Sequence, residues 1–234
     1  MTRIACPTCG QGYPEGNRHS CKPMFECECG QKIVRRTLSH IHHWETPTDI
    51  YQRITTSEDM KYAYPTPLLL ARDRALPAIT FLLVNRISMS LMLKNSQFDR
   101  GSNPDFIVVK DLNINKNISG GIPIRDEFFL PRSGDLAPLT QLVETYLEML
   151  GPDQKLFPMT RQWALTIVTQ KTKGMWDHWL RSMAEKYYAN KIKAMGSASP
   201  ESDLAHLVGV KSTDSVRPYL GFTAWDILKK EISK

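Results

Sequence analysis

The stretch 65–93, PTPLLLARDRALPAITFLLVNRISMSLML, decides the class of fold that the chain adopts. Its apolar residues recur at steps of three and four, the spacing that places side chains on one face of a helix. We therefore expect a helix with a buried face, and Pro77 predicts a kink or a new helix start within it. The expected buried face consists of Leu68, Leu69, Leu76, Ile79, Leu82, Leu83 and Ile87.

The sequence that follows predicts one hairpin and then a run of helices. Residues 105–114 and 122–131 are rich in β-forming side chains, and the segment NKNISGG between them has turn composition. Periodicity and stop signals predict helices over 136–150, 159–171 and 176–193, another from Ser199, and short ones over 215–219 and 223–232. The expected fold class is mainly α (α+β), with a small β-hairpin or sheet.

Composition and charge narrow the class of protein. The chain has 234 residues, a hydrophobic content of 41% and a formal net charge of +6, which is typical of a soluble globular protein with a real core. No apolar run reaches the roughly 18 residues that span a bilayer, and the N-terminal MTRIACPTCG lacks the apolar core of a signal peptide. We expect a cytoplasmic protein with no membrane partner, whose basic charge is compatible with a polyanion such as DNA.

All five cysteines lie within the first 29 residues, and their spacing indicates a metal site. An odd number of cysteines in a chain expected to be cytoplasmic favours metal ligands over disulfides. We predict one structural zinc ion in a module over 1–36 that resembles a zinc ribbon and depends on the metal to fold. The best ligand set is Cys6, Cys9, Cys27 and Cys29, with Cys21 or His19 as an alternative for one of them.

A basic segment joins this module to the rest of the chain. We expect a linker over 37–50 and a second domain over 51–234. Lys32, Arg35 and Arg36 either belong to a solvated linker region or form a basic strap across a DNA backbone.

His178 and Arg181 carry the clearest chemical signal in the chain. They are three residues apart on the helix expected over 176–193, so they share one face of it. Both can donate hydrogen bonds to one oxyanion, and Tyr219, ten positions beyond Gly209, could attack a phosphorus held there. Asp177 or Glu185, on the same helix, could instead pair with them.

In this order the segments resemble the catalytic domain of the tyrosine recombinases, the phage-type integrases. ARDRALPAITFLLVNRIS at 71–88 resembles the first box, with Arg86 as its arginine. The hairpin at 105–131 lies where that family has its catalytic-lysine hairpin, and residues 176–181 resemble the second box. LVGVKSTDSVRPY at 207–219 resembles the third box and the nucleophile. The resemblance covers about residues 47–230.

The resemblance implies a site-specific recombinase or integrase, of the kind that mobile elements, viruses and archaea carry. Arg86 and Arg181 would clamp the scissile phosphate, and Tyr219 would form the 3′-phosphotyrosine bond. His178 would assist proton transfer or hold the phosphate. Lys116, with Lys110 as the alternative, would protonate the leaving 5′-oxygen.

The implied partners are double-stranded DNA and further copies of the chain in a tetrameric synapse, and no catalytic cofactor is implied. We also expect the zinc ribbon and basic strap to replace the family's N-terminal clamp.

Four positions depart from the family's pattern. Val84 stands where glycine is usual, Met89 where glutamate is frequent, Ser182 where histidine is usual, and Val210 where histidine or tryptophan is usual. Valine cannot hydrogen-bond a phosphate oxygen, although Lys211 could reach across instead. The sequence therefore leaves two alternatives open. One is a decayed recombinase fold that binds DNA in regulation or replicon maintenance. The other is a zinc-ribbon protein whose unrelated helical domain binds protein partners.

Overall fold

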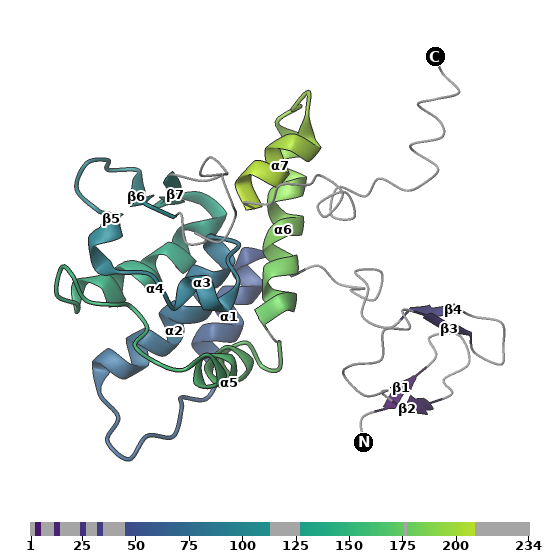
Figure 1. The fold of residues 1–234 in the computed structure, drawn as a ribbon, viewed down its shortest axis with the longest axis horizontal. Coiled ribbons are helices and arrows are strands. Elements are labelled where there is room, and N and C mark those ends of the chain that lie inside the picture. Colours follow the sequence, from purple (N-terminus) through teal and green to yellow (C-terminus); the bar gives the residue numbers. More distant parts are fainter. Residues whose placement is uncertain are drawn as a thin grey trace, which may run out of the picture. The chain divides into compact units, whose positions relative to one another are not determined.

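The chain forms two units, Met1–Trp44 and Glu45–Lys234, in the computed structural model. Residues 45–112, 127–175 and 177–208 are described, together with the backbone of four short strands in the first unit. Figure 1 shows the elements of both units in sequence colours.

The first unit contains two antiparallel hairpins. Strand β1 (Arg3–Ala5) pairs with β2 (Gly12–Pro14), and β3 (Met24–Glu26) pairs with β4 (Lys32–Val34). The predicted zinc ligands lie outside the described residues. In the sequence, Cys6 and Cys9 fall between the strands of one hairpin, and Cys27 and Cys29 between those of the other.

The second unit is mainly helical with a small antiparallel sheet, as the sequence predicts. In chain order its described elements are α1 (Pro47–Thr56), α2 (Pro67–Leu82), α3 (Ile87–Ser90), the 3-10 turn η2 (Asn95–Gln97), β5 (Phe98–Asp99), β6 (Phe106–Lys110), β7 (Glu127–Pro131), the 3-10 turn η3 (Gly134–Leu136), α4 (Ala137–Glu148), α5 (Arg161–Lys171), α6 (Asp177–Ala194) and α7 (Pro200–Val208). The helices predicted over 136–150, 159–171 and 176–193 correspond to α4, α5 and α6. The short helices predicted beyond residue 208 lie outside the described residues.

Helix α2 forms the centre of this unit and contacts α1, α4, α5 and α6. Its second half is buried on all sides, which is what an apolar helix without a polar face requires. The prediction was right for Leu76, Ile79 and Leu82, but wrong for Leu68, which is exposed in the first turn. Periodicity identifies the apolar face of a helix but not where its packing partners end. The helix also continues through Pro77, so no new helix starts there.

Helix α1 has no counterpart among the helices that the sequence predicts, the first of which begins at residue 65. Residues 47–50 were expected to belong to a linker, and they form the first turn of α1. The Thr46 side chain accepts a hydrogen bond from the backbone N–H of Asp49, and the Asp49 carboxylate accepts one from the backbone N–H of Thr46. The hydrogen bonds that the Asp49 carboxylate accepts from the backbone N–H and the hydroxyl of Thr46 lower the pKa of Asp49. The reciprocal cap fixes the start of the helix.

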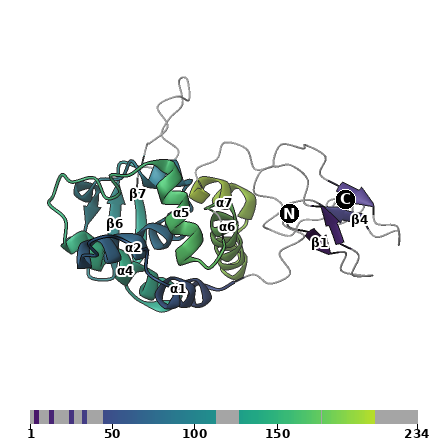
Figure 2. The same ribbon diagram turned by 90° about the horizontal axis from the view of Figure 1, so that it is seen from below.

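The sheet has three strands in the order β5, β6 and β7. The predicted hairpin is present as β6 and β7, which pair with Val108 opposite Phe129. Strand β5, which the sequence did not predict, is only two residues long and pairs with β6 through Phe98 and Val109. Figure 2 shows β6 and β7 with α2 and α4 beside them. The residues between β6 and β7 at 113–126 lie outside the described residues.

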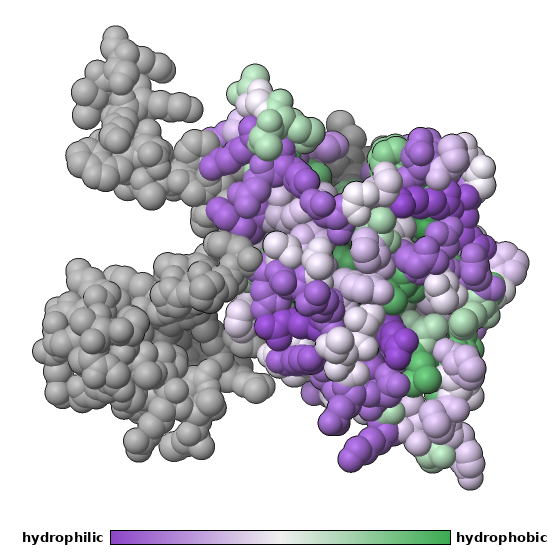
Figure 3. All heavy atoms as spheres, turned by 180° about the vertical axis from the view of Figure 1, so that it is seen from behind, coloured by the Kyte–Doolittle hydropathy of each residue, from purple (hydrophilic) through white to green (hydrophobic). Residues whose placement is uncertain are grey.

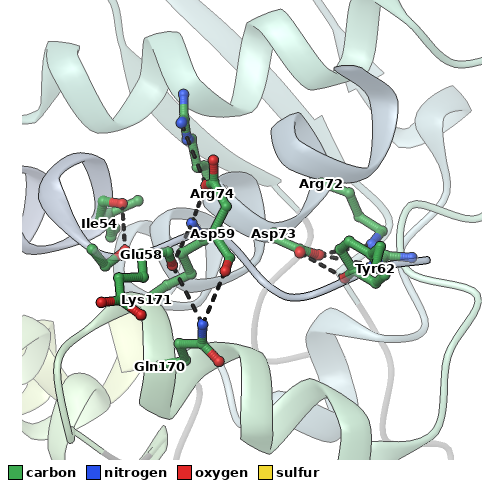
Figure 4. A network of polar contacts seen from close by, with 10 residues as sticks. Ile54, Glu58, Asp59, Tyr62, Arg72, Asp73, Arg74, Gln170 and Lys171 are labelled. Carbon is green, nitrogen blue, oxygen red and sulfur yellow. Dashed lines mark hydrogen bonds and ion pairs between the residues drawn. The ribbon is translucent and has the colours of Figure 1, made fainter. Parts of the chain in front are cut away.

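A polar network holds the segment between α1 and α2 against α5 (Figure 4). Lys171 on α5 is fully buried, and its Nζ donates to Asp59 Oδ1 at 2.5 Å and to the carbonyl of Glu58 at 3.1 Å. Arg74 on α2 lies 3.5 Å from the same carboxylate. The hydrogen bond from Lys171 lowers the pKa of Asp59. The buried ammonium group is therefore fully compensated, as burial of a charge requires.

A second cluster holds the same segment to α2. Asp73 is fully buried, and its carboxylate accepts hydrogen bonds from Arg72 Nη2 at 2.8 Å and from Tyr62 Oη at 2.6 Å. Burial, followed by the hydrogen bond to Asp73, raises the pKa of Tyr62 to about 12. The phenol therefore stays protonated and donates to the carboxylate throughout the neutral range.

The surface of the second unit is mostly hydrophilic on the face that Figure 3 shows, with apolar side chains in small scattered groups. Among the described helices, none combines the length and the apolar character that crossing a membrane would require.

Candidate functional site

The turn that follows α2 has a left-handed cap of the kind usually built on glycine. Leu83 is the C-cap residue, and Val84 after it has a φ of 53°. The N–H of Val84 donates to the carbonyl of Phe81 at 3.0 Å, and the N–H of Asn85 donates to the carbonyl of Thr80 at 3.1 Å. These two bonds satisfy the last carbonyls of the helix, and glycine is the common residue at the left-handed position.

Valine is poorly suited to this conformation because its branched Cβ crowds the backbone. Val84 nevertheless occupies it, with a side chain that is only 1% exposed. The buried isopropyl group and the two capping bonds offset the strain. Val84 therefore has a backbone conformation that is common for glycine and rare for a β-branched residue.

We expect Val84→Gly to cost less stability than a buried valine normally would. Relief of left-handed strain contributes about 1–2 kcal/mol, which offsets most of the ~2 kcal/mol lost with the buried side chain. Val143→Gly is the matched control, because Val143 is fully buried in the regular helix α4 and has no strain to relieve. Urea denaturation should give a clearly smaller loss for Val84→Gly. Equal losses in the two variants would show that Val84 is unstrained.

Arg86 is presented by this turn. It is the N-cap residue of α3 and is exposed, and its side chain makes no hydrogen bond or ion pair with any residue of the described segments. The neighbouring Asn85 is buried, and its Nδ2 has no hydrogen-bond partner within the same described segments. Among the described residues, Arg86 therefore presents an exposed guanidinium without a polar partner, just beyond the end of α2.

Helix α6 carries the other two described candidates. His178 is exposed in its first turn. Arg181, one turn later, is buried, and its Nε donates to Glu185 Oε1 at 2.7 Å. The pairing of Arg181 with Glu185, one of the alternatives that the sequence left open, is present. The backbone carbonyl of His178 accepts a hydrogen bond from Ser182 Oγ at 2.9 Å.

The turn that carries Arg86 lies close to α6. Tyr188 Oη on α6 donates to the carbonyl of Leu82 at 2.9 Å, at the C-terminal end of α2. Arg181 lies seven residues before Tyr188, which is about 10 Å along the helix axis at the usual rise per residue. No hydrogen bond or ion pair between described side chains joins Arg86 to His178 or Arg181. The turn follows α2 directly, and α6 packs against α2.

The remaining predicted residues lie outside the described part of the chain. They are Lys116, Tyr219, Lys211, Arg35 and Arg36, together with the four predicted cysteine ligands, and only the backbone of Lys32 is described, in β4. Among the described residues, no group of three or more histidine, cysteine, aspartate or glutamate side chains could hold a metal ion.

Lys110, the alternative to Lys116, is described at the end of β6. Its Nζ lies 3.0 Å from Asp99 Oδ2 on the neighbouring strand. This hydrogen bond raises the pKa of Lys110 and lowers the pKa of Asp99. Lys110 is thus held protonated by Asp99. The sequence did not predict this pairing.

Sequence reasoning also missed a surface hollow between the segment at 56–61 and α5. Its volume is about 640 Å³, and Lys61, Trp163 and Lys173 are among the residues that line it. These residues are far apart in the sequence and form no motif, so periodicity and spacing carry no signal for the hollow.

Comparisons of the chain with protein-family models, with curated proteins and with solved structures gave no match.

Proposed function

We propose that the protein binds duplex DNA and breaks and rejoins it as a tyrosine recombinase. The observation that carries the proposal is the turn at Val84. A buried helix ends in a left-handed residue, at the position where the recombinase pattern has glycine, and presents an exposed arginine two residues later. A β-branched residue in this conformation is rare, and strain of this kind clusters at functional sites.

The order of the elements also supports the proposal. After the Arg86 turn come an antiparallel hairpin (β6 and β7), two helices, and α6 with His178 and Arg181. This is the order in which the recombinase boxes occur in the sequence. The exposed guanidinium of Arg86 would supply positive charge to a transferring phosphate, and Arg181, paired with Glu185, would supply further hydrogen-bond donors.

The chemistry that we propose conserves bond energy. The Tyr219 oxygen attacks the phosphorus, and the P–O5′ bond breaks as the phosphotyrosine bond forms. His178 accepts the tyrosine proton, and Lys116 gives a proton to the leaving 5′-oxygen. Attack by a 5′-hydroxyl reverses these steps and rejoins the strand. The two arginines bind the non-bridging oxygens, on which charge develops in the transition state.

A covalent adduct between the protein and a nicked duplex tests the proposal. With an unknown target, the probe is a pool of nicked duplexes of randomised sequence, which release a short strand after cleavage and so trap the intermediate. We expect an adduct that survives denaturing electrophoresis. Retention of duplexes without an adduct would instead favour the decayed, DNA-binding alternative. The pairing of Arg181 with Glu185 favours that alternative, because a neutral pair leaves less positive charge for a phosphate. Absence of both would favour a helical domain that binds protein partners.

The N-terminal unit would contribute a structural zinc site and a basic strap that binds the DNA backbone. The two hairpins support this, because each predicted cysteine pair falls between the strands of one hairpin whereas Cys21 does not. Deleting residues 1–46 should then weaken DNA binding while the helical unit stays folded.

Removal of zinc should unfold the N-terminal unit alone. In this proposal the metal supplies the folding free energy of that unit, while the described helices all belong to the second unit. A chelator should therefore make residues 1–44 susceptible to protease and leave the helical circular dichroism unchanged. Cys29→Ser should lose the zinc, and Cys21→Ser is the matched control that should keep it. A purified chain without zinc would contradict the prediction.

A further inference from the structure

The ion pair on α6 is unusual for a pair within a single helix. Arg181 Nε lies 2.7 Å from Glu185 Oε1, and the two side chains are only 10% and 6% exposed. Most pairs of this spacing lie on the surface, where they contribute little and are screened by salt. Here both charges have left water, which carries a desolvation cost.

The pair is not explained by helix stability. The favourable order on a helix has the acidic residue four positions before the basic one, and here the order is reversed. Arg181 is also close to the N-terminal end of α6, where the helix dipole disfavours a cation. Replacing a buried ion pair by apolar residues of similar volume is often neutral or stabilising. The arrangement therefore calls for another reason.

The geometry of the guanidinium supplies one. Glu185 engages Nε, and the N–H groups on the two Nη atoms of Arg181 make no hydrogen bond to any residue in the described segments. None of these Nη atoms is a fully buried polar atom without a partner. The guanidinium is thus fixed at one edge by the carboxylate, while the Nη edge keeps its donors for an external acceptor.

We propose that Glu185 is a positioning residue that holds Arg181 ready for the scissile phosphate. The carboxylate fixes the orientation of the guanidinium before DNA binds. The Nη donors of Arg181 can then bind the non-bridging oxygens with little further loss of side-chain conformational entropy. Arginine's planar fork suits such binding once one edge is fixed. The neutral pair adds no net charge to the site, and Arg86 supplies it. The inference rests on the proposed function.

Two variants of Glu185 separate this role from a structural one. Glu185→Ala removes the acceptor, and Glu185→Gln keeps a carbonyl oxygen that can accept the Nε–H bond. The readout is the rate of adduct formation on a nicked duplex recovered from the randomised pool, at a temperature where all variants are folded. We expect Glu185→Ala to slow the adduct by about 10–100-fold, the usual effect of losing a residue that orients a site ligand. Glu185→Gln should stay close to wild type, and the Kd for DNA should change little in both.

Glu144→Ala is the matched control. It removes an ion pair of the same 2.7 Å length, between Glu144 on α4 and Arg132, which lies outside the proposed site. Its adduct rate should equal that of the wild type, even where its melting temperature falls.

The outcomes are distinguishable from failure of the proposed function. If the wild type forms an adduct and Glu185→Ala forms it at the same rate or faster, the positioning role is overturned and the recombinase proposal stands. Equal slowing in Glu185→Ala and Glu185→Gln also overturns it, since the acceptor is retained in one of them. If the wild type forms no adduct on any duplex of the pool, both proposals fall.

Discussion

Replacing Tyr219 with phenylalanine is expected to abolish the covalent protein–DNA adduct. The change removes only the hydroxyl oxygen that would attack the phosphorus, and the loss of a nucleophile typically lowers a rate by on the order of 10³–10⁶. Duplex affinity should persist, because it depends on contacts between basic side chains and the phosphate backbone. Adduct formation is measured on nicked duplexes by denaturing electrophoresis, and affinity by fluorescence anisotropy at several salt concentrations.

Tyr64→Phe is the matched control for this experiment. Tyr64 is 86% exposed in the segment before α2 and has no place in the proposed chemistry. Its variant should form the adduct at the wild-type rate. An adduct that persists in Tyr219→Phe would show that another residue is the nucleophile, and one lost in Tyr64→Phe would show that the assay reports general damage.

Asp73→Ala is expected to cause the largest loss of stability among the substitutions considered. Asp73 is fully buried and accepts hydrogen bonds from Arg72 and Tyr62 (Figure 4). Removing one partner of a buried pair typically costs about 3–5 kcal/mol, because the other charge stays buried without compensation. Here the Arg72 guanidinium would lose its carboxylate and the Tyr62 hydroxyl would lose its acceptor, which leaves them, among the described residues, only the hydrogen bond from Arg72 Nη2 to Tyr62 Oη. Urea denaturation followed by circular dichroism measures the loss.

The exposed pair of Lys191 and Asp135 provides the comparison. Its nitrogen–oxygen distance, 2.9 Å, is close to that of Arg72 and Asp73, but both of its side chains are more than half exposed. Asp135→Ala should therefore leave the denaturation midpoint almost unchanged. Similar midpoints for the Asp73 and Asp135 variants would mean that the buried cluster does not hold α2 to the segment before it.

The sequence predicted most of the longer helices, because their evidence is local, but it predicted no helix at α1. Apolar spacing identified α2, α4, α5 and α6 within a few residues, and β-forming residues identified β6 and β7. It failed at Leu68, because periodicity does not reveal where a neighbouring helix ends. It also missed β5, whose two residues are too few to carry a pattern and form a strand only by pairing with β6.

For the candidate site, too, the sequence predicted local features but not those that depend on tertiary packing. Spacing alone placed His178 and Arg181 on one helical face, whereas Arg86 was identified through the resemblance of residues 71–88 to the first recombinase box. The exposure of these side chains and their hydrogen-bond partners depend on tertiary packing, which spacing along the sequence does not reveal. The exposure of Arg86, the burial of Arg181 beside Glu185, and the contact of Tyr188 with Leu82 are properties of the packed helices.

By itself, the sequence determined the order of the helices, the hairpin and the clustering of cysteines, since periodicity, turn composition and spacing are encoded within short segments. Only the tertiary structure decided that Val84 adopts a left-handed conformation, that Lys171 and Asp73 are buried with partners, and that Arg181 is buried beside Glu185. Each of these depends on removing a side chain from water by packing distant segments together. The free energy of that burial, rather than any local preference, selects the strained backbone and the paired charges.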